Sequence, residues 1–165
     1  MGFFSKLFGN GQKVNPNGVY APVAGKAVPL SAVPDATFAE GMLGYGVAIE
    51  PADGKICAPC DGKIDTMFAT GHAVAMTAKN GAEILIHVGL ETVGLEGKPF
   101  TIHCKNGDEV KKGDLLMEAD LDMIKAAGLN TITPVVVCNS DEFSTFNVTT
   151  GCDVTNDNTI VVLAK

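Results

Sequence analysis

One segment of this chain, residues 72–90, constrains the fold more tightly than any other. In it, two runs of alternating apolar residues flank an Asn80-Gly81 dipeptide. This arrangement indicates a β-hairpin, because both central positions of a type I′ turn need a positive φ angle, which Asn and Gly tolerate. The sequence therefore predicts two antiparallel strands, at residues 72–79 and 82–90, joined by a two-residue loop.

The predicted register brings two histidines together. With a two-residue loop, His72 lies opposite Gly89, and Gly89 shares its face with His87 because side chains alternate along a strand. The two imidazoles are then diagonal neighbours, with Cα atoms roughly 7–8 Å apart. Gly89 leaves room for the rings to lean together. A three-residue loop would instead place His72 on the opposite face and separate the pair.

The two faces of the second strand differ in chemistry. One face is unbroken and apolar, and it comprises Ile84, Ile86, Val88 and Leu90. The other face is mixed, and it comprises Glu83, Leu85, His87 and Gly89. The apolar face is expected in the core, whereas a buried face rarely combines a carboxylate, an imidazole and a glycine. We expect the mixed face to line a shallow, partly exposed surface.

The remainder of the chain is a succession of short strands and tight turns. Further strands are predicted at residues 46–50, 56–58, 62–68, 115–118, 134–138 and 159–164. Helical signals are confined to residues 36–40, behind Pro34-Asp35, and residues 120–127, which Gly128 closes. We therefore predict an all-β fold, an antiparallel β-sandwich or distorted barrel of many short strands with only short helical turns.

An internal echo adds pseudo-symmetry to this fold. Residues 21–32 and 58–69 agree at five of twelve positions, and both begin with Ala-Pro and place Gly-Lys at the fifth and sixth. A solenoid needs at least ~3 stacked units. A single pair favours two similar β-turn-β corners in one sandwich or barrel.

The chain length of 165 residues predicts one folded domain, residues 16–165, behind a flexible tail of residues 1–15. The tail carries apolar residues at helical spacing: Phe3, Phe4, Leu7 and Phe8. Two interpretations stand equal, a frayed tail and a weak contact with a membrane surface. The N-terminal Met and the tail favour a free-standing chain over a domain cut from a larger multidomain protein.

Charge and cysteine content exclude several classes of function. The net charge of −7 argues against a sequence-independent nucleic-acid binder, which needs a basic face. All 12 basic residues are Lys, so a phosphate site cannot use a guanidinium clamp. No secretory signal precedes the five cysteines, which form no disulfide framework, and a cytoplasmic location with reduced thiols is expected.

A facing histidine pair has a defined chemical use. Neutral imidazole, with an unperturbed pKa near ~6.5, is a nucleophile and a metal ligand at neutral pH. One histidine can attack a phosphoryl group while the other donates its N–H to the phosphoryl oxygens. The hydroxyl of Thr70 is placed to hold the ring of His72 in one tautomer. The alternative is a pair of hydrogen-bonded surface histidines without a role.

Metal binding is the other use of such a pair. Two histidines fall short of the three or four ligands of zinc sites, so no intrinsic metal is expected at His72 and His87. A transient zinc would need a ligand supplied by a partner. Cys57-Ala-Pro-Cys60 and His103-Cys104 are the other candidates for a metal or redox site. We interpret Cys57 and Cys60 as small buried hydrophobes, because they lie in a strand-to-turn segment and not at a helix N-terminus, and His103 as an ordinary strand-end residue.

The hairpin and its surroundings resemble a known family. The segment from Gly81 to Val93, GAEILIHVGLETV, is similar to the phosphohistidine signature of the glucose-type enzyme IIA proteins of the bacterial phosphoenolpyruvate-dependent sugar phosphotransferase system. Further blocks resemble the same family: residues 35–40 (DATFAE), 44–46 (GYG), 58–62 (APCDG), 70–73 (TGHA) and 133–136 (TPVV). The resemblance extends from about Val19 to the C-terminus.

The resemblance implies an antiparallel β-sandwich that acts as a phosphotransferase component. Such a protein accepts a phosphoryl group from the phosphocarrier HPr and passes it to the cysteine of an enzyme IIB domain for sugar uptake, with no cofactor required. The residue that matches the phosphorylated histidine is His87, through Nε2. The supporting histidine matches His72, with Thr70 in its hydrogen-bond network. At Gly71, some members carry Asn.

The resemblance also implies a partner-binding surface. Its apolar part falls on Phe38, Met42, Leu43, Phe68, Leu85 and Val93. Glu91, where the family often has Asp, keeps an acidic rim that would steer a basic partner. Regulatory targets that read the phosphorylation state are implied as well. A zinc-dependent hydrolase or metal-binding module on a related β-fold stays the alternative, and a biotinyl or lipoyl carrier fails for lack of a Lys at a suitable hairpin tip.

Overall fold

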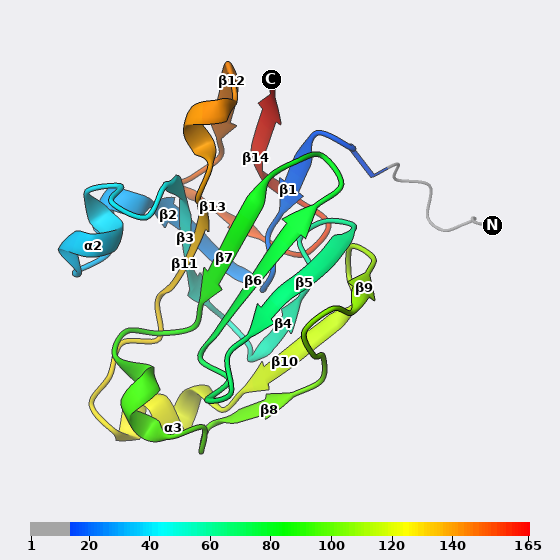
Figure 1. The fold of residues 1–165 in the computed structure, drawn as a ribbon. Helices are drawn as coiled ribbons and strands as arrows, with labels where there is room; N and C mark the ends of the chain where they lie inside the picture. The colour runs from blue at the N-terminus through cyan, green and yellow to red at the C-terminus, as the bar shows by residue number, and fades with distance from the viewer. Residues whose placement is uncertain (1–13) are drawn as a thin grey trace.

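The structure, a computed structural model, describes residues 14–165. In these residues the largest sheet has eight strands (Figure 1), in the order β13 (Cys152–Val154), β2 (Gly25–Pro29), β3 (Tyr45–Pro51), β11 (Thr133–Val137), β7 (Glu83–His87), β6 (Ala73–Ala78), β5 (Gly62–Met67) and β9 (Glu109–Val110). Two three-stranded sheets accompany it, β1 (Gly18–Tyr20), β14 (Thr159–Ala164) and β12 (Thr145–Val148), and β4 (Lys55–Cys57), β10 (Leu115–Ala119) and β8 (Phe100–Ile102).

Helices are short and few within residues 14–165. They are α2 (Ala36–Ala39), α3 (Leu121–Ala126) and the 3-10 turns η1 (Leu30–Ala32), η2 (Thr92–Leu95) and η3 (Ser140–Glu142). Asp35 caps α2 by accepting a hydrogen bond from the amide of Thr37, and Asp120 caps α3 through the amide of Met123. Every strand pair described is antiparallel. The predicted all-β antiparallel architecture is confirmed.

The strand order of the sheets has an approximate two-fold symmetry. The eight-stranded sheet has the same arrangement in both directions from its centre, where Val135 of β11 pairs with Ile86 of β7. On one side follow the hairpin β3–β2 and the short edge strand β13, and on the other the hairpin β6–β5 and the short edge strand β9. The two three-stranded sheets correspond in the same way, strand for strand.

The repeated Ala-Pro segments lie where the two halves meet. The amide of Tyr20 donates to the carbonyl of Pro59 (2.9 Å), and the amide of Cys57 donates to the carbonyl of Pro22 (2.7 Å). These two bonds are equivalent under the offset of the sequence repeat. The repeat is thus a pair of reciprocal corners that hydrogen-bond to each other.

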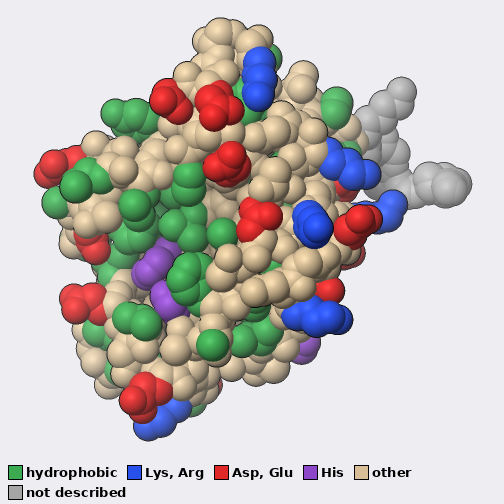
Figure 2. Space-filling model, in the orientation of Figure 1, with side chains coloured by type: hydrophobic (Ala, Val, Ile, Leu, Met, Phe, Trp, Pro, Cys, Tyr) green, Lys and Arg blue, Asp and Glu red, His purple; other side chains and the backbone are tan. Residues whose placement is uncertain are grey.

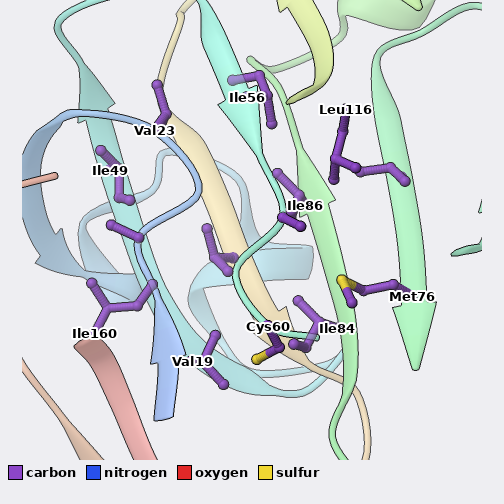
Figure 3. Close-up of a cluster of buried hydrophobic side chains, with 14 of the residues drawn as sticks. Val19, Val23, Ile49, Ile56, Cys60, Met76, Ile84, Ile86, Leu116 and Ile160 are labelled. Atoms are coloured by element: carbon purple, nitrogen blue, oxygen red, sulfur yellow. The ribbon is translucent and has the colours of Figure 1, made fainter. Parts of the chain in front are cut away.

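Two hydrophobic clusters lie on the two faces of the central sheet. The larger one contains the inward side chains of β3, β7 and β11 together with residues from β1, β4, β10 and β14, and Figure 3 shows part of it, including Ile49, Ile84 and Ile86. The smaller one lies on the opposite face, beneath residues 30–44, and comprises Leu30, Val33, Phe38, Ala48, Leu90, Ile132 and Val136. The expected split between the two faces of residues 83–90 is therefore present, apart from Leu90.

The hairpin register differs from the prediction by one residue. Ala78 lies opposite Ala82, with 2.8 Å between the amide nitrogen of Ala78 and the carbonyl oxygen of Ala82, so the loop has three residues. Gly81 has a φ of 94°, but Asn80 is not in the left-handed region, so a type I′ turn does not form. Instead the Oδ1 atom of Asn80 accepts from the amide of Ala82, and Gly81 supplies the left-handed residue of a three-residue loop.

The expected separation of the histidines by such a loop is nevertheless wrong. In this register His72 faces Val88, whose amide donates to its carbonyl (2.7 Å), and a regular strand would turn its ring to the core. His72, however, precedes the first residue of β6 and follows Gly71, whose φ is 74°. Strand alternation does not apply across a left-handed residue. The ring of His72 therefore lies beside that of His87.

Residues 1–13 of the tail predicted at residues 1–15, with its predicted membrane contact, lie outside the described residues. The domain boundary at residue 16 stays a prediction. In the described part of the chain, no helix has the length and apolar character needed to cross a membrane.

Candidate functional site

His87 is the last residue of β7, and its ring is fixed by its own chain. Its Nδ1 lies 2.7 Å from the carbonyl oxygen of Gly89. A carbonyl only accepts hydrogen bonds, so Nδ1 must carry the proton. Nε2 is then left with its lone pair and without a proton. The turn after β7 thus sets the tautomer that a nucleophilic imidazole needs.

His72 approaches from the neighbouring strand. It is 8% exposed, and its Nδ1 lies 2.5 Å from the Oγ1 of Thr70. The turn that carries both residues is closed by the amide of Gly71, which donates to the carbonyl of Phe68 (2.7 Å). The centroids of the His72 and His87 rings are 5.1 Å apart, with an interplanar angle of 76°. The structure therefore brings together Thr70, His72 and His87.

The two imidazoles belong to a row of four rings, which we call the ring row. Phe38 contacts His87 at a centroid distance of 5.1 Å, His87 contacts His72, and Phe68 contacts His72 at 5.3 Å. The ends of the row differ in exposure, because Phe38 is 5% exposed and Phe68 is 38% exposed. One end is anchored in the small cluster beneath residues 30–44, and the other end faces solvent.

The environment keeps both imidazoles neutral. Burial lowers the pKa of His87 below its usual value, against the opposing influence of the hydrogen bond to Gly89 and of the carboxylate of Asp35. Burial also lowers the pKa of His72, and the proximity of His87 lowers it further. Desolvation disfavours the charged form of a histidine. At neutral pH both rings are therefore in the form that can attack or donate without a permanent charge.

The surface around the pair is apolar at the centre and acidic at part of its border, as Figure 2 shows. Of the predicted partner-binding residues, Met42 (70% exposed), Val93 (51%) and Leu43 (38%) present their side chains to solvent. Leu85 lies on the His87 face of β7 and is half-buried, and Glu91 is exposed. Phe38 is almost fully buried, unlike the other members of this set.

The segment after β7 is held in a constrained conformation. Glu91 has a φ of 59°, in the left-handed region that favours glycine, and Thr92 is fully buried with its Oγ1 donating to the carbonyl of Val88 (2.6 Å). The amide of Leu90 donates to the carbonyl of Asn130 (2.9 Å). These bonds fix the carbonyl of Gly89, and with it His87.

Sequence reasoning missed two contributions to the site. Gly89 was expected to give room to His72, but its carbonyl anchors His87. Asp35 belongs to a helix-start signal and a family block and was not predicted at the site, yet the charge of its carboxylate acts to raise the pKa of His87. A clue to Asp35 was its position before residues 36–40, because an N-cap fixes where a helix starts and therefore what Phe38 covers.

The other candidate ligands do not join the pair. In residues 14–165, no group of three or more His, Cys, Asp or Glu side chains is close enough together to hold a metal ion. All five cysteines are free thiols, and burial raises the pKa of Cys60 to about 12. The thiol of Cys60 donates to the carbonyl of Gly18. His103 pairs with the carboxylate of Glu118 (2.8 Å) on the surface.

Comparison with known proteins identifies close relatives. Residues 17–143 match the family model described as phosphoenolpyruvate-dependent sugar phosphotransferase system, EIIA 1. The PTS system glucose-specific EIIA component of Bacillus anthracis is 45% identical over 159 residues, which cover 96% of each protein. The PTS system beta-glucoside-specific EIIBCA component of Bacillus subtilis (strain 168) is 49% identical over 126 residues, which cover 76% of this chain and 21% of that protein.

A solved structure agrees with these matches. The glucose permease IIA from Mycoplasma capricolum has a TM-score of 0.82 and 35% sequence identity, and the match covers 88% of this chain and 94% of that one. The likeness therefore extends to the fold, and the family match over residues 17–143 includes Thr70, His72 and His87.

Proposed function

Since the chain belongs to the EIIA 1 family of the phosphoenolpyruvate-dependent sugar phosphotransferase system, and is a phosphocarrier of that system, we propose that His87 carries the phosphoryl group and that His72 stabilises it. As a component of this system the protein acts in the cytoplasm and exchanges phosphoryl groups with HPr and an enzyme IIB domain. The observation that carries the residue assignment is the bond from His87 Nδ1 to the carbonyl of Gly89, which leaves Nε2 free to attack.

The first half-reaction follows from this tautomer. The Nε2 lone pair of His87 attacks the phosphorus of phospho-HPr, the P–N bond of the donor breaks, and its electron pair returns to the donor imidazole. The low pKa of His87 keeps the attacking nitrogen unprotonated at neutral pH. In the second half-reaction the sulfur of the enzyme IIB cysteine attacks the same phosphorus, and the bond to Nε2 breaks.

His72 supplies a hydrogen-bond donor for the transferring group. If the hydroxyl of Thr70 donates to Nδ1 of His72, the proton of that ring lies on Nε2. A ring 5.1 Å from His87 can then direct its Nε2–H to a phosphoryl oxygen. Such a preorganised donor stabilises charge that develops in the transition state. Thr70 therefore orients His72, and His72 stabilises the phosphoryl group that His87 carries.

The exposed apolar side chains around the pair are proposed to receive both partner proteins. Met42, Leu43, Phe68 and Val93 are large and exposed, which is characteristic of a partner surface. Glu91 adds negative charge beside them, and a basic partner surface complements it. The chain itself offers no Arg for the phosphoryl group, so we propose that the partner brings cationic groups.

We further propose that the sugar served is glucose. The support is that three relatives that match over 96% or more of both chains are glucose-specific EIIA components. Measured phosphoryl transfer to IIB domains of glucose and beta-glucoside permeases would distinguish the two sugars.

A zinc ion held by His72 and His87 would need its remaining ligands from a partner protein.

The residue assignment is tested by phosphorylation. The purified protein is incubated with phosphoenolpyruvate, enzyme I and HPr, and acid-labile, base-stable phosphate is measured on wild type, His87→Ala and His103→Ala. His103→Ala is the matched control, because His103 is an exposed histidine outside the pair. We expect label on wild type and on His103→Ala, and none on His87→Ala. Undiminished label on His87→Ala would contradict the assignment.

A further inference from the structure

Phe38 differs from the other residues of the proposed partner surface. It is 5% exposed, whereas Met42 is 70% exposed and Val93 is 51% exposed. A side chain that offers so little surface gains little from contact with a partner, because binding energy scales with the apolar area removed from water. The position of Phe38 therefore calls for a different explanation from that of its exposed neighbours.

The ring of Phe38 is held rigidly from below. It belongs to the small hydrophobic cluster on the outer face of the central sheet, with Val33, Leu90 and Val136 among its members. The helix that carries it, α2, begins at a fixed point because Asp35 caps it. Close packing leaves a buried ring few alternative rotamers.

The same ring forms one wall of the His87 site. Its centroid lies 5.1 Å from that of His87, at an interplanar angle of 57°, which is within the range of favourable aromatic pairs. His87 is thus bounded by Phe38 on one side and by His72 on the other, and its Nδ1 is tied to Gly89. The hydrogen bond to Gly89 fixes which edge of the His87 imidazole faces the backbone. The rings of Phe38 and His72 restrict rotation of the imidazole about its Cβ–Cγ bond.

We propose that Phe38 is a positioning residue for phosphoryl transfer, whose buried ring holds the imidazole of His87 in one orientation and keeps water from its flank. This inference rests on the proposed role of His87. It separates two functions within one surface, because exposed residues such as Met42 bind the partner and Phe38 prepares the nucleophile. Exclusion of water by Phe38 also accounts for part of the burial that lowers the pKa of His87.

The test compares loss of the ring with loss of an equally buried ring elsewhere. Phe38→Leu keeps an apolar side chain in the cluster but removes the aromatic ring beside His87. Phe38→Tyr restores an aromatic ring there. Phe143→Leu is the matched control, since Phe143 is 7% exposed in the large cluster. For each variant, nuclear magnetic resonance gives the pKa and tautomer of His87, and a concentration series of phospho-HPr gives kcat and KM for phosphoryl acceptance.

We expect Phe38→Leu to raise the pKa of His87 and to lower kcat about tenfold while KM changes less than about twofold, because about 1.4 kcal/mol of orientation and desolvation is lost. Phe38→Tyr should recover most of kcat, and Phe143→Leu should destabilise the fold without moving the pKa of His87. An unchanged pKa with a raised KM would overturn the proposal and assign Phe38 to partner binding. If Phe38→Leu does not fold, Phe38→Met replaces it.

The two proposals fail in different ways. If wild type accepts no phosphate, the role of His87 is wrong whatever the variants of Phe38 do. If wild type accepts phosphate and Phe38→Leu has an unchanged pKa and kcat, only the positioning role is wrong.

Discussion

Thr70 and His72 are joined by the shortest side-chain hydrogen bond of the site, with 2.5 Å between Oγ1 and Nδ1. Two residues of one tight turn therefore share one side-chain hydrogen bond, to the second imidazole of the site. Since that ring lies 5.1 Å from His87, the turn between β5 and β6 places a hydrogen-bonded imidazole beside a residue on β7.

Thr70→Val tests this bond. The variant keeps the shape of the side chain but loses the hydroxyl, so the ring of His72 is no longer held in one tautomer. We expect onward transfer to enzyme IIB to slow about tenfold and the free energy of unfolding to fall by about 1 kcal/mol. Thr77→Val is the control, because its hydroxyl bonds the carboxylate of Asp65 on the exposed side of the same hairpin. Equal transfer rates in both variants would remove Thr70 from the mechanism.

His72→Gln separates acceptance from donation. Glutamine retains an N–H donor but lacks the rigid imidazole ring that Thr70 orients toward the phosphoryl group. We expect the variant still to accept phosphate on His87 and to pass it on poorly. Rapid-quench measurements with phospho-HPr and then with an enzyme IIB domain give the two rates. Normal onward transfer would show that His72 has no part in the reaction.

The pH dependence of phosphoryl acceptance follows from the lowered pKa of His87. Only the neutral ring attacks, so the rate should rise with pH through a midpoint below 6.5 and be constant near neutrality. The measurement is the single-turnover rate between pH 5 and pH 8 with a prephosphorylated donor. A midpoint at or above 6.5 would contradict the effect of burial.

Stability should depend on pH through the same groups. Both histidines have a folded pKa below the ordinary value of 6.5, so between these values the unfolded chain binds more protons than the folded one. The free energy of unfolding should therefore fall as the pH drops below 6.5, by at most about 1.4 kcal/mol per pH unit for each histidine. Urea denaturation at several pH values measures this slope. The double variant His72→Gln/His87→Gln should reduce it, and an unchanged slope would refute the linkage.

Gly71→Ala tests the turn that releases His72 from strand alternation. Gly71 has a φ of 74°, and a Cβ atom there would lie 2.6 Å from the Cβ of Phe100. We expect a loss of about 1–3 kcal/mol in the free energy of unfolding and weaker phosphoryl transfer, because the turn must shift. Gly107→Ala is the control, since Gly107 also has a positive φ, 88°, but an added Cβ meets nothing within 4 Å. Equal losses would mean that backbone strain alone, and not contact with Phe100, is responsible.

Much of the fold and of the family was predictable from local patterns. The strands predicted at 46–50, 56–58, 62–68, 115–118, 134–138 and 159–164 correspond to β3, β4, β5, β10, β11 and β14. The family and the phosphocarrier role inferred from the segment around His87 are confirmed. Six strands were not predicted: β1, β2, β8, β9, β12 and β13. They have two to five residues, too few for a clear alternation, and they form through pairing with neighbouring strands of the sheets.

The histidine pair was predicted on an argument that the structure corrects. The expected loop of two residues gave the right neighbours by the wrong register, because Asn80 uses its side chain to bond Ala82 instead of adopting a positive φ. Local sequence favours both loop types, and the choice depends on bonds from distant residues such as Asn139, whose amide donates to the carbonyl of Gly81 (2.9 Å). Such long-range contacts are absent from any local pattern.

During synthesis, the two halves of the fold are completed at different times. The half built from β4 to β10 lies in the continuous stretch 55–119, whereas β1 and the hairpin β2–β3 obtain their other partners only from β11, β13 and β14. Gly18 of β1 pairs with Val162 of β14, so this pair can form only when almost the whole chain has been made. Joining the termini and opening the chain at residues 52–54 would make both halves continuous. Because fewer distant segments then have to meet, such a permuted chain should refold faster than the natural order.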